Sequence, residues 1–211
     1  DGERQAAYRS GGNERLSLNH VPDEAIEWAD HVHLGSPMRL SSMDGKGTAE
    51  LFRRAKLKGK TTSMDLVVPL DNIWLPKIEE VLHYCDIFLP SDYEVSQVCG
   101  LTDPLQIKEF FRPYGLSVFG IKMGANGVFV TDYKQDVWLP ASTNRVIDTL
   151  GAGDSFVAAF LSSYKKGFSL RDCAAISSIA SGFVVQELGT THGMKSFDDL
   201  YKEAKNYFNI K

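Results

Sequence analysis

Apolar and polar residues alternate along the first half of the chain with two different periods. Short runs rich in β-branched and apolar residues predict buried strands, whereas apolar positions three or four residues apart predict helices. The strands are expected at residues 5–9, 31–35, 61–68 and 85–89, and the helices at residues 22–29, 44–58, 73–83, 92–98 and 104–111. Strands that alternate with helices are typical of a mostly parallel sheet with helices on its faces.

The pattern changes near Leu116, where strand-like runs follow one another with only short turns between them. These runs are residues 116–122, 128–131 and 137–139. Their spacing predicts antiparallel hairpins at an edge of the sheet. Beyond Asp148 the pattern becomes helical, with helices expected up to Gly167, at about residues 170–187 and at residues 197–208. No repeat or linker interrupts the sequence, so we expect one α/β domain over residues 1–211.

Composition and charge narrow the range of partners. The 211 residues carry 23 Lys and Arg against 27 Asp and Glu, a net charge of −4. An acidic chain without a Lys/Arg-rich face argues against nucleic acid as a partner. No apolar run reaches the roughly 18 residues of a membrane span, so we expect no contact with a membrane. The sequence therefore favours small molecules as binding partners.

Cysteine and histidine do not predict a metal site. Cys85, Cys99 and Cys173 are far apart and lack ligand spacing, so we expect reduced thiols in a cytoplasmic protein. His31 and His33 flank one residue of a predicted strand, which places both on one face. Packing at the strand end explains these two histidines better than metal binding does.

The segment of residues 146–156 is the part of the sequence that indicates chemistry. A strand-like approach leads to Gly151 and Gly153, which let several backbone N–H groups face one concavity at a helix N-terminus. Such a terminus favours an anion, most naturally a phosphate. Asp154 would repel that anion unless it acts as a base that accepts a proton from an attacking hydroxyl. Asp154 could equally cap the helix, and the residues alone leave both interpretations open.

The same segment resembles a family signature. Residues 148–154, followed by Ala-Ala-Phe-Leu at 158–161, match the C-terminal signature of the ribokinase/PfkB family of carbohydrate kinases. Residues 86–94 and 122–128 resemble two further family segments in order and spacing. Tyr8 and Arg9 resemble a pair found in the fructokinase and 2-keto-3-deoxygluconate kinase branch. The resemblance implies a ribokinase-like α/β fold and ATP-dependent phosphorylation of a sugar hydroxyl.

The resemblance also implies roles for individual residues. Asp154 would be the general base, and the amides of Gly151, Ala152 and Gly153 would form the anion hole for the transferred phosphoryl group. ATP would contact Lys122, Gly124 and Gly127 beside its phosphates and Val137, Pro140 and Ser178 around its adenine. Lys122 could alternatively be a solvated strand end, and the residues do not decide between the two.

Metal and sugar sites follow from the same resemblance. Glu94 would help to order Mg²⁺, while Asp148 and the backbone of Leu150 would border a monovalent cation, usually K⁺. Tyr8 and Arg9 would contact a small sugar or sugar acid. Glu94 could instead be an ordinary carboxylate in the first turn of a helix, and Arg9 a surface cation.

The sequence departs from the family pattern at several points. Ser91 stands where the family has Asn, and Asp65 is not followed by the usual Asn and Arg. The family's N-terminal strand and lid segment have no counterpart, so the fold is expected to be incomplete at the N-terminus, with weak nucleotide binding and little turnover. The alternative function is a non-catalytic nucleotide- or sugar-binding homologue. The resemblance also implies a homodimer of the intact protein.

Overall fold

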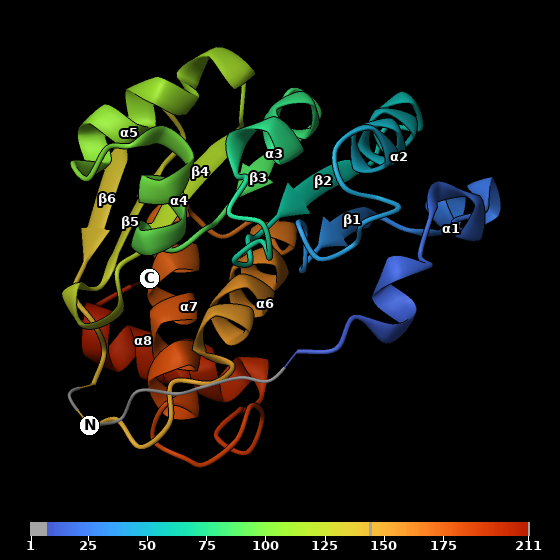
Figure 1. Ribbon diagram of the computed structural model, residues 1–211. Helices are drawn as coiled ribbons and strands as arrows, with labels where there is room; N and C mark the ends of the chain where they lie inside the picture. The colour runs from blue at the N-terminus through green and yellow to red at the C-terminus, as the bar shows by residue number, and fades with distance from the viewer. Residues whose placement is uncertain (1–7, 144, 211) are drawn as a thin grey trace. The chain divides into compact units, whose positions relative to one another are not determined.

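The computed structural model of the chain describes residues 8–143 and 145–210 (Figure 1). These residues divide into two compact units, the first ending at Phe119 and the second beginning at Gly120. The six strands follow the order β1-β2-β3-β4-β5-β6. The division falls within strand β4 (Val118–Lys122).

The first unit is built on parallel strands. β1 (His31–Leu34), β2 (Thr61–Met64) and β3 (Ile87–Phe88) pair in parallel, and β3 pairs in parallel with the start of β4. One row of the sheet runs from Leu34 through Met64 and Phe88 to Phe119. The predicted parallel arrangement is therefore confirmed.

Capping side chains mark the start of some helices in the first unit. Asp103 accepts the Leu105 amide at 2.8 Å, and Pro104 occupies the first helical position, where its missing N–H costs nothing. The helices and 3-10 turns are α1 (Asp23–Trp28), α2 (Lys46–Leu57), α3 (Leu75–Leu82), α4 (Asp92–Cys99), α5 (Pro104–Phe111), η1 (Gly11–Glu14), η2 (Leu18–His20) and η3 (Arg112–Tyr114). Phe88, Phe111 and Phe119 pack together in the core, with ring centroids 5.0–6.0 Å apart.

The predicted and observed strands differ most at residues 61–68 and 5–9. The strand expected at residues 61–68 ends at Met64, because its neighbours β1 and β3 pair with it only as far as that residue. Most of the strand expected at residues 5–9 lies outside the described residues, and Tyr8 and Arg9 are not in a strand.

The second unit begins with the end of β4. The 3-10 turn η4 (Gly124–Asn126) leads into β5 (Val128–Thr131), which pairs antiparallel with β6 (Asp136–Leu139). Val128 lies opposite Leu139, and Thr131 lies opposite Asp136. The predicted edge hairpin is confirmed.

Three helices complete the second unit. They are α6 (Ala152–Lys165), α7 (Leu170–Val184) and α8 (Phe197–Phe208). α7 packs against both α6 and α8, as Figure 1 shows. Ser196 accepts the Asp199 amide and caps α8.

The thiols and the paired histidines are structural. All three cysteines are free, and burial raises the pKa of the Cys173 thiol to about 11. Ser63 lies 2.6 Å from Nε2 of His31 and 2.7 Å from Nδ1 of His33, so both rings share one face of the sheet. Among the described residues, no group of three or more His, Cys, Asp or Glu side chains could hold a metal ion.

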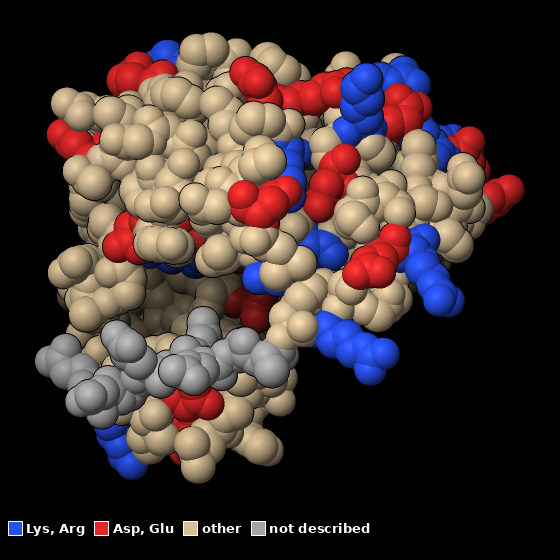
Figure 2. All heavy atoms as spheres, viewed as in Figure 1, with Lys and Arg blue, Asp and Glu red and all other residues tan. Residues whose placement is uncertain are grey.

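Charged side chains of both signs mix on the surface of the first unit. Arg54 pairs with Asp23, and Lys58 pairs with Glu27 at 2.5 Å, which joins α2 to α1. Figure 2 shows basic and acidic side chains interspersed over these helices on the face in view. No helix in the described part of the chain is long and apolar enough to cross a membrane.

Candidate active site

The N-terminus of α6 follows a tight turn that only glycine can make. Gly151 has a φ of +81°, in the left-handed region. A Cβ atom there would lie 2.6 Å from the carbonyl oxygen of Thr190. The backbone of Thr190 therefore packs directly on Gly151, and any side chain would force the two segments apart.

Asp148 fixes the turn in place from the preceding loop. Its Oδ1 accepts the Leu150 amide at 2.9 Å, and its Oδ2 accepts the Gly189 amide at 3.0 Å. Ser181, on α7, donates its hydroxyl to the Ala152 carbonyl at 2.7 Å. The helix start is thus held by two segments that are distant in the sequence.

Lys122 brings a positive charge to the same helix terminus. A Cβ atom at Gly153 would lie 3.2 Å from Nζ of Lys122, so the ammonium group sits against the first turn of α6. The helix dipole and this ammonium both favour an anion. The structure thus places Lys122 beside the glycine turn, and its predicted contact with the phosphates of ATP stays a prediction.

Not every amide of the turn is available to an anion. The Ala152 amide donates to the Thr149 carbonyl at 3.3 Å, a long bond that closes the turn. The amides of Gly153 and Asp154 belong to the first helical turn, which has no earlier helical carbonyl to bond. The donors best placed for an anion are therefore these two amides and Lys122.

Asp154 is the third residue of α6, and its side chain is exposed. An exposed carboxylate one residue from Gly153 can accept a proton from a hydroxyl group brought to the bound anion. The Asp154 side chain is not a helix cap, because the N-cap position belongs to Gly151.

The turn after β4 is shaped by a close backbone approach. A Cβ atom at Gly127 would lie 2.0 Å from the Leu139 carbonyl oxygen and 2.8 Å from Pro140. The Met123 amide donates to the Gly127 carbonyl at 2.8 Å, which closes the turn that contains Gly124. The structure thus brings Gly127 and Pro140, two of the predicted ATP neighbours, into contact.

The segment after β6 also reaches α7. The Ser142 hydroxyl donates to the Ser178 carbonyl at 2.7 Å, and a Cβ atom at Gly182 would lie 2.0 Å from that hydroxyl. Ser178 is therefore next to the chain that follows Pro140. Val137 is buried in β6.

Glu94, in the first unit, has a structural role at the start of α4. Its Oε2 accepts the Ser91 amide at 2.8 Å, and its own amide donates to the Ser91 hydroxyl at 3.4 Å. This reciprocal arrangement is a capping box. Ser91, in the place of the family's Asn, is thus the N-cap of α4.

Tyr8, also in the first unit, contacts a residue that the sequence did not single out. Its hydroxyl donates to the Arg39 carbonyl at 3.4 Å and accepts the Asn13 amide at 3.2 Å. The Arg39 guanidinium lies over the Tyr8 ring, 4.5 Å from its centroid. A single Arg in a loop gives no sequence signal, so only the fold reveals this contact. Arg9 is exposed.

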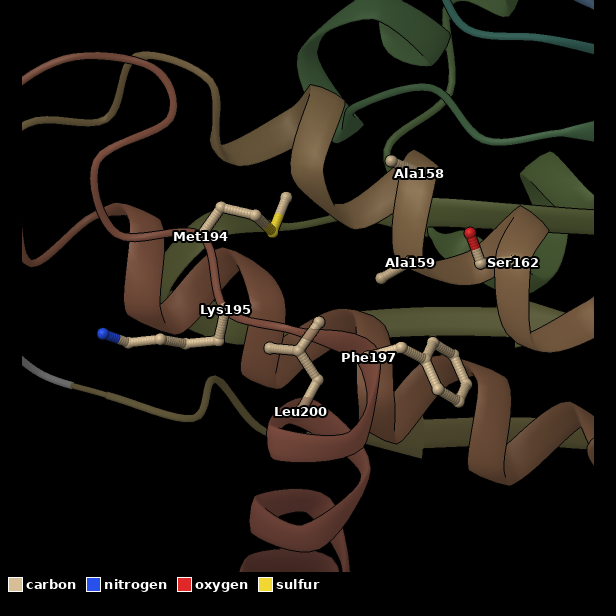
Figure 3. Close-up of a pocket in the computed structure, with 7 residues that line it drawn as sticks. All are labelled: Ala158, Ala159, Ser162, Met194, Lys195, Phe197 and Leu200. Carbon is tan, nitrogen blue, oxygen red and sulfur yellow. The ribbon is translucent and has the colours of Figure 1, made fainter.

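A small hollow of about 150 Å³ lies further along α6. Its lining comes from α6 (Ala158, Ala159, Ser162), from α8 (Phe197, Leu200) and from Met194 and Lys195 before it. Figure 3 shows the Lys195 ammonium directed away from the other lining side chains. With Ser162 as its remaining polar side chain, the hollow lacks the convergent polar groups of a binding site.

Comparison with known proteins places this geometry in a family. The model of the pfkB family of carbohydrate kinases matches residues 1–196. The chain is 23% identical to an uncharacterized sugar kinase of Archaeoglobus fulgidus, over 92% of the chain and 76% of the relative. It is 25% identical to the 2-dehydro-3-deoxygluconokinase of Bacillus subtilis, over 95% of the chain and 64% of the relative.

Solved structures of the same fold agree. A putative ribokinase II from E. coli, solved with ATP and Mg²⁺, is similar with a TM-score of 0.77 and 20% identity, covering 91% of the chain and 64% of that protein. Ribokinase from Arabidopsis thaliana, solved with ribose and ATP, has a TM-score of 0.73 and 23% identity, covering 87% of this chain and 58% of the ribokinase. The chain thus spans less than two thirds of either solved protein, and the expected ribokinase-like fold is confirmed. With residues 1–196 matched, the chain belongs to the pfkB family of carbohydrate kinases.

Proposed function

We propose that the protein transfers a phosphoryl group from ATP to a sugar hydroxyl. The observation that carries this proposal is the start of α6, where Lys122 lies against Gly153 and the exposed Asp154 carboxylate follows one residue later. A protein that only binds phosphate gains nothing from a carboxylate beside it. The names of the relatives, among them a sugar kinase and a 2-dehydro-3-deoxygluconokinase, support the same activity.

In this proposal Asp154 acts as the general base. It accepts the proton of the sugar hydroxyl as that oxygen bonds to the γ-phosphorus, and the bond from phosphorus to the β-phosphate oxygen breaks to release ADP. The Gly153 and Asp154 amides and Lys122 stabilise the charge on the transferred group. The predicted contribution of the Gly151 amide stays a prediction, and that of the Ala152 amide requires its long bond to Thr149 to open.

Glu94 and Asp148 are the carboxylates proposed for the two implied cations. Mg²⁺ usually takes one or two carboxylates and completes its shell with phosphate oxygens and water, and when bound it would neutralise charge on the transferred group. Glu94 would help to order this Mg²⁺ ion, as the resemblance implies. For K⁺, Asp148 and the backbone of Leu150 are the proposed neighbours, and each Asp148 oxygen also accepts one backbone amide.

For the acceptor we propose a sugar or sugar acid that contacts Tyr8 and Arg9. The 2-dehydro-3-deoxygluconokinases of Bacillus subtilis and Thermoproteus tenax, 25% and 27% identical to this chain, support this class of acceptor. We also expect a cytoplasmic homodimer of the intact protein. Light scattering after size exclusion would measure its mass.

A coupled assay of ADP release over a panel of sugars tests the activity. Ribose, fructose and 2-dehydro-3-deoxygluconate are each offered with ATP and Mg²⁺ to the protein and to its Asp154→Asn variant. We expect turnover with at least one sugar and its loss in the variant. Equal turnover by both would contradict the assignment of the base.

Equilibrium binding of a fluorescent ATP analogue distinguishes the proposed kinase activity from the alternative function. Binding without turnover of any sugar would favour a non-catalytic nucleotide-binding protein. Asp172→Asn is the matched control, because Asp172 is the third residue of α7 as Asp154 is of α6. This variant should behave as the parent in both measurements.

A further inference from the structure

Two nitrogen atoms of the half-buried Arg39 side chain, Nε and Nη1, are buried without an acceptor among the described residues. Within residues 8–143 and 145–210, neither Nε nor Nη1 has a hydrogen-bond partner, and both atoms are shielded from solvent. Arginine cannot lose its proton at any ordinary pH, so the charge stays. Buried side-chain N–H groups are nearly always hydrogen-bonded. The fold therefore keeps a charged donor for which the described residues supply no acceptor.

The described surroundings hold Arg39 in place but supply no acceptor for its Nε and Nη1 atoms. Tyr8 stacks on the guanidinium face, 4.5 Å from ring centroid to Cζ, and a stacked ring does not accept the N–H groups at the guanidinium edge. The backbone is fixed as well. Asp44 accepts the Met38 amide at 2.7 Å and the Leu40 amide at 3.2 Å, one on each side of Arg39. Asp44 thus braces the loop instead of neutralising the arginine.

The location is where a ligand would be expected. Arg39 lies in the loop that follows β1, at the carboxyl end of a parallel strand. Ligands of open α/β sheets bind outside the carboxyl ends of the strands. Two neutral polar groups belong to the same cluster of side chains. They are the Tyr8 hydroxyl and the side-chain amide of Asn13, whose oxygen and nitrogen are 3.2 Å apart.

We propose that Arg39, together with Tyr8 and Asn13, binds an oxyanion carried by the sugar substrate, either a carboxylate or a phosphate group. The substrate of the kinase is then an acidic sugar. The planar guanidinium supplies the charge and donors that such a group accepts. This inference rests on the proposed function in calling the bound sugar a substrate. Binding of the oxyanion itself does not depend on turnover.

Calorimetric titration without ATP tests the site directly. The probes are 2-dehydro-3-deoxy-D-gluconate, D-fructose 6-phosphate and neutral D-fructose, offered to the protein and to Arg39→Gln. Arg15→Gln is the control, because Arg15 is exposed and lies in the same segment. We expect an acidic sugar to bind at least about 10-fold more tightly than fructose, the equivalent of about 1.4 kcal/mol. Arg39→Gln should remove that advantage and Arg15→Gln should keep it.

The two probes distinguish the source of the oxyanion. Preference for the gluconate identifies a carboxylate, and preference for the phosphate ester identifies a phosphate group. Fructose binding as tightly as both, or an unchanged affinity in Arg39→Gln, overturns the proposal. So does the absence of binding by either acidic sugar.

Thermal unfolding separates a binding residue from a structural one. Replacing an unpaired buried charge should leave Tm unchanged or raise it, so a folded Arg39→Gln with weakened binding supports the site. A large fall in Tm would indicate that Arg39 serves the fold through Tyr8, and it would overturn the proposal. If acidic sugars bind but none is phosphorylated, the proposed kinase activity fails while the oxyanion site stands.

Discussion

Helices α6 and α7 begin in opposite ways, although each has Asp as its third residue. Ser169 caps α7 by accepting the Asp172 amide at 3.1 Å. Gly151 stands at the same position of α6 and has no side chain that could accept the Asp154 amide. The amide that α7 satisfies internally is thus left by α6 for an external acceptor.

The difference shows how a helix terminus becomes a candidate site. α8 repeats the pattern of α7, with Ser196 accepting the Asp199 amide at 3.2 Å. Such caps stabilise a helix by roughly 1 kcal/mol. α6 forgoes that stabilisation, and the bond from Asp148 to Gly189 and the contact of Gly151 with Thr190 hold its start instead. The helix start is therefore held by tertiary contacts and still has amide donors to offer.

The largest expected effect contrasts the two aspartates. In the intact protein, Asp154→Asn should lower kcat by about 1,000-fold because the general base is lost, with little change in the affinity for ATP. Asp172→Asn should leave kcat unchanged. Steady-state kinetics of both variants measures the contrast. Similar small losses in the two would mean that Asp154 is as structural as Asp172.

Lys122 gives the next effect, on nucleotide affinity. Lys122→Met removes the ammonium beside Gly153, and we expect the Kd for ATP to rise about 10- to 100-fold, as for the loss of a charged hydrogen bond. Lys134→Met, in the exposed turn between β5 and β6, is the control. A fluorescent ATP analogue measures both. An unaltered Kd in Lys122→Met would make this lysine a solvated strand end.

Gly151 can be compared with Gly167, which lies just beyond the other end of α6. Both have positive φ, but a Cβ at Gly167 would meet no described atom within 4 Å. Gly151→Ala should lower the free energy of unfolding by about 3 kcal/mol through strain and collision with Thr190, whereas Gly167→Ala should cost about 1 kcal/mol. Urea unfolding provides the values. Equal losses would show that the Thr190 contact yields easily.

The smallest effect comes from removing the Ser169 cap of α7, a kind of cap that α6 does not have. Ser169→Ala should lower the free energy of unfolding by about 1 kcal/mol and leave ATP binding unchanged, since α7 would lose only its internal acceptor. Thermal melts with and without nucleotide provide the measurement. A matching loss of ATP affinity would mean that the two helix starts are not independent.

The sequence predicted elements best where local signals agreed with tertiary pairing. The bounds of α5, β5 and α8 match the expected residues, because Asp103, Ser196 and the β-branched run at 128–131 mark them locally. The strand expected to continue beyond Met64 does not, since strand length depends on partners that no single segment encodes.

The candidate site shows the same difference between features that are encoded locally and features that depend on tertiary contacts. Gly151, Gly153 and Lys122 were predicted, and the structure brings Lys122 to the glycine turn. The sequence did not reveal that the Asp148 carboxylate reaches Gly189, because that bond joins residues brought together only by folding. Arg39 was missed for the same reason, as burial of a guanidinium cannot be read from a single loop residue.

The Asp148–Gly189 bond has a consequence for the order of assembly during folding. It spans 41 residues, so it forms only after the entropic cost of closing that loop has been met. α7 lies within the loop, and the start of α6 therefore takes its final shape only once α7 is in place. We expect the Leu150 and Gly189 amides, both bonded to Asp148, to exchange hydrogen through one shared opening event. A nascent chain that stops before residue 189 would have the glycine turn but not the brace that shapes it.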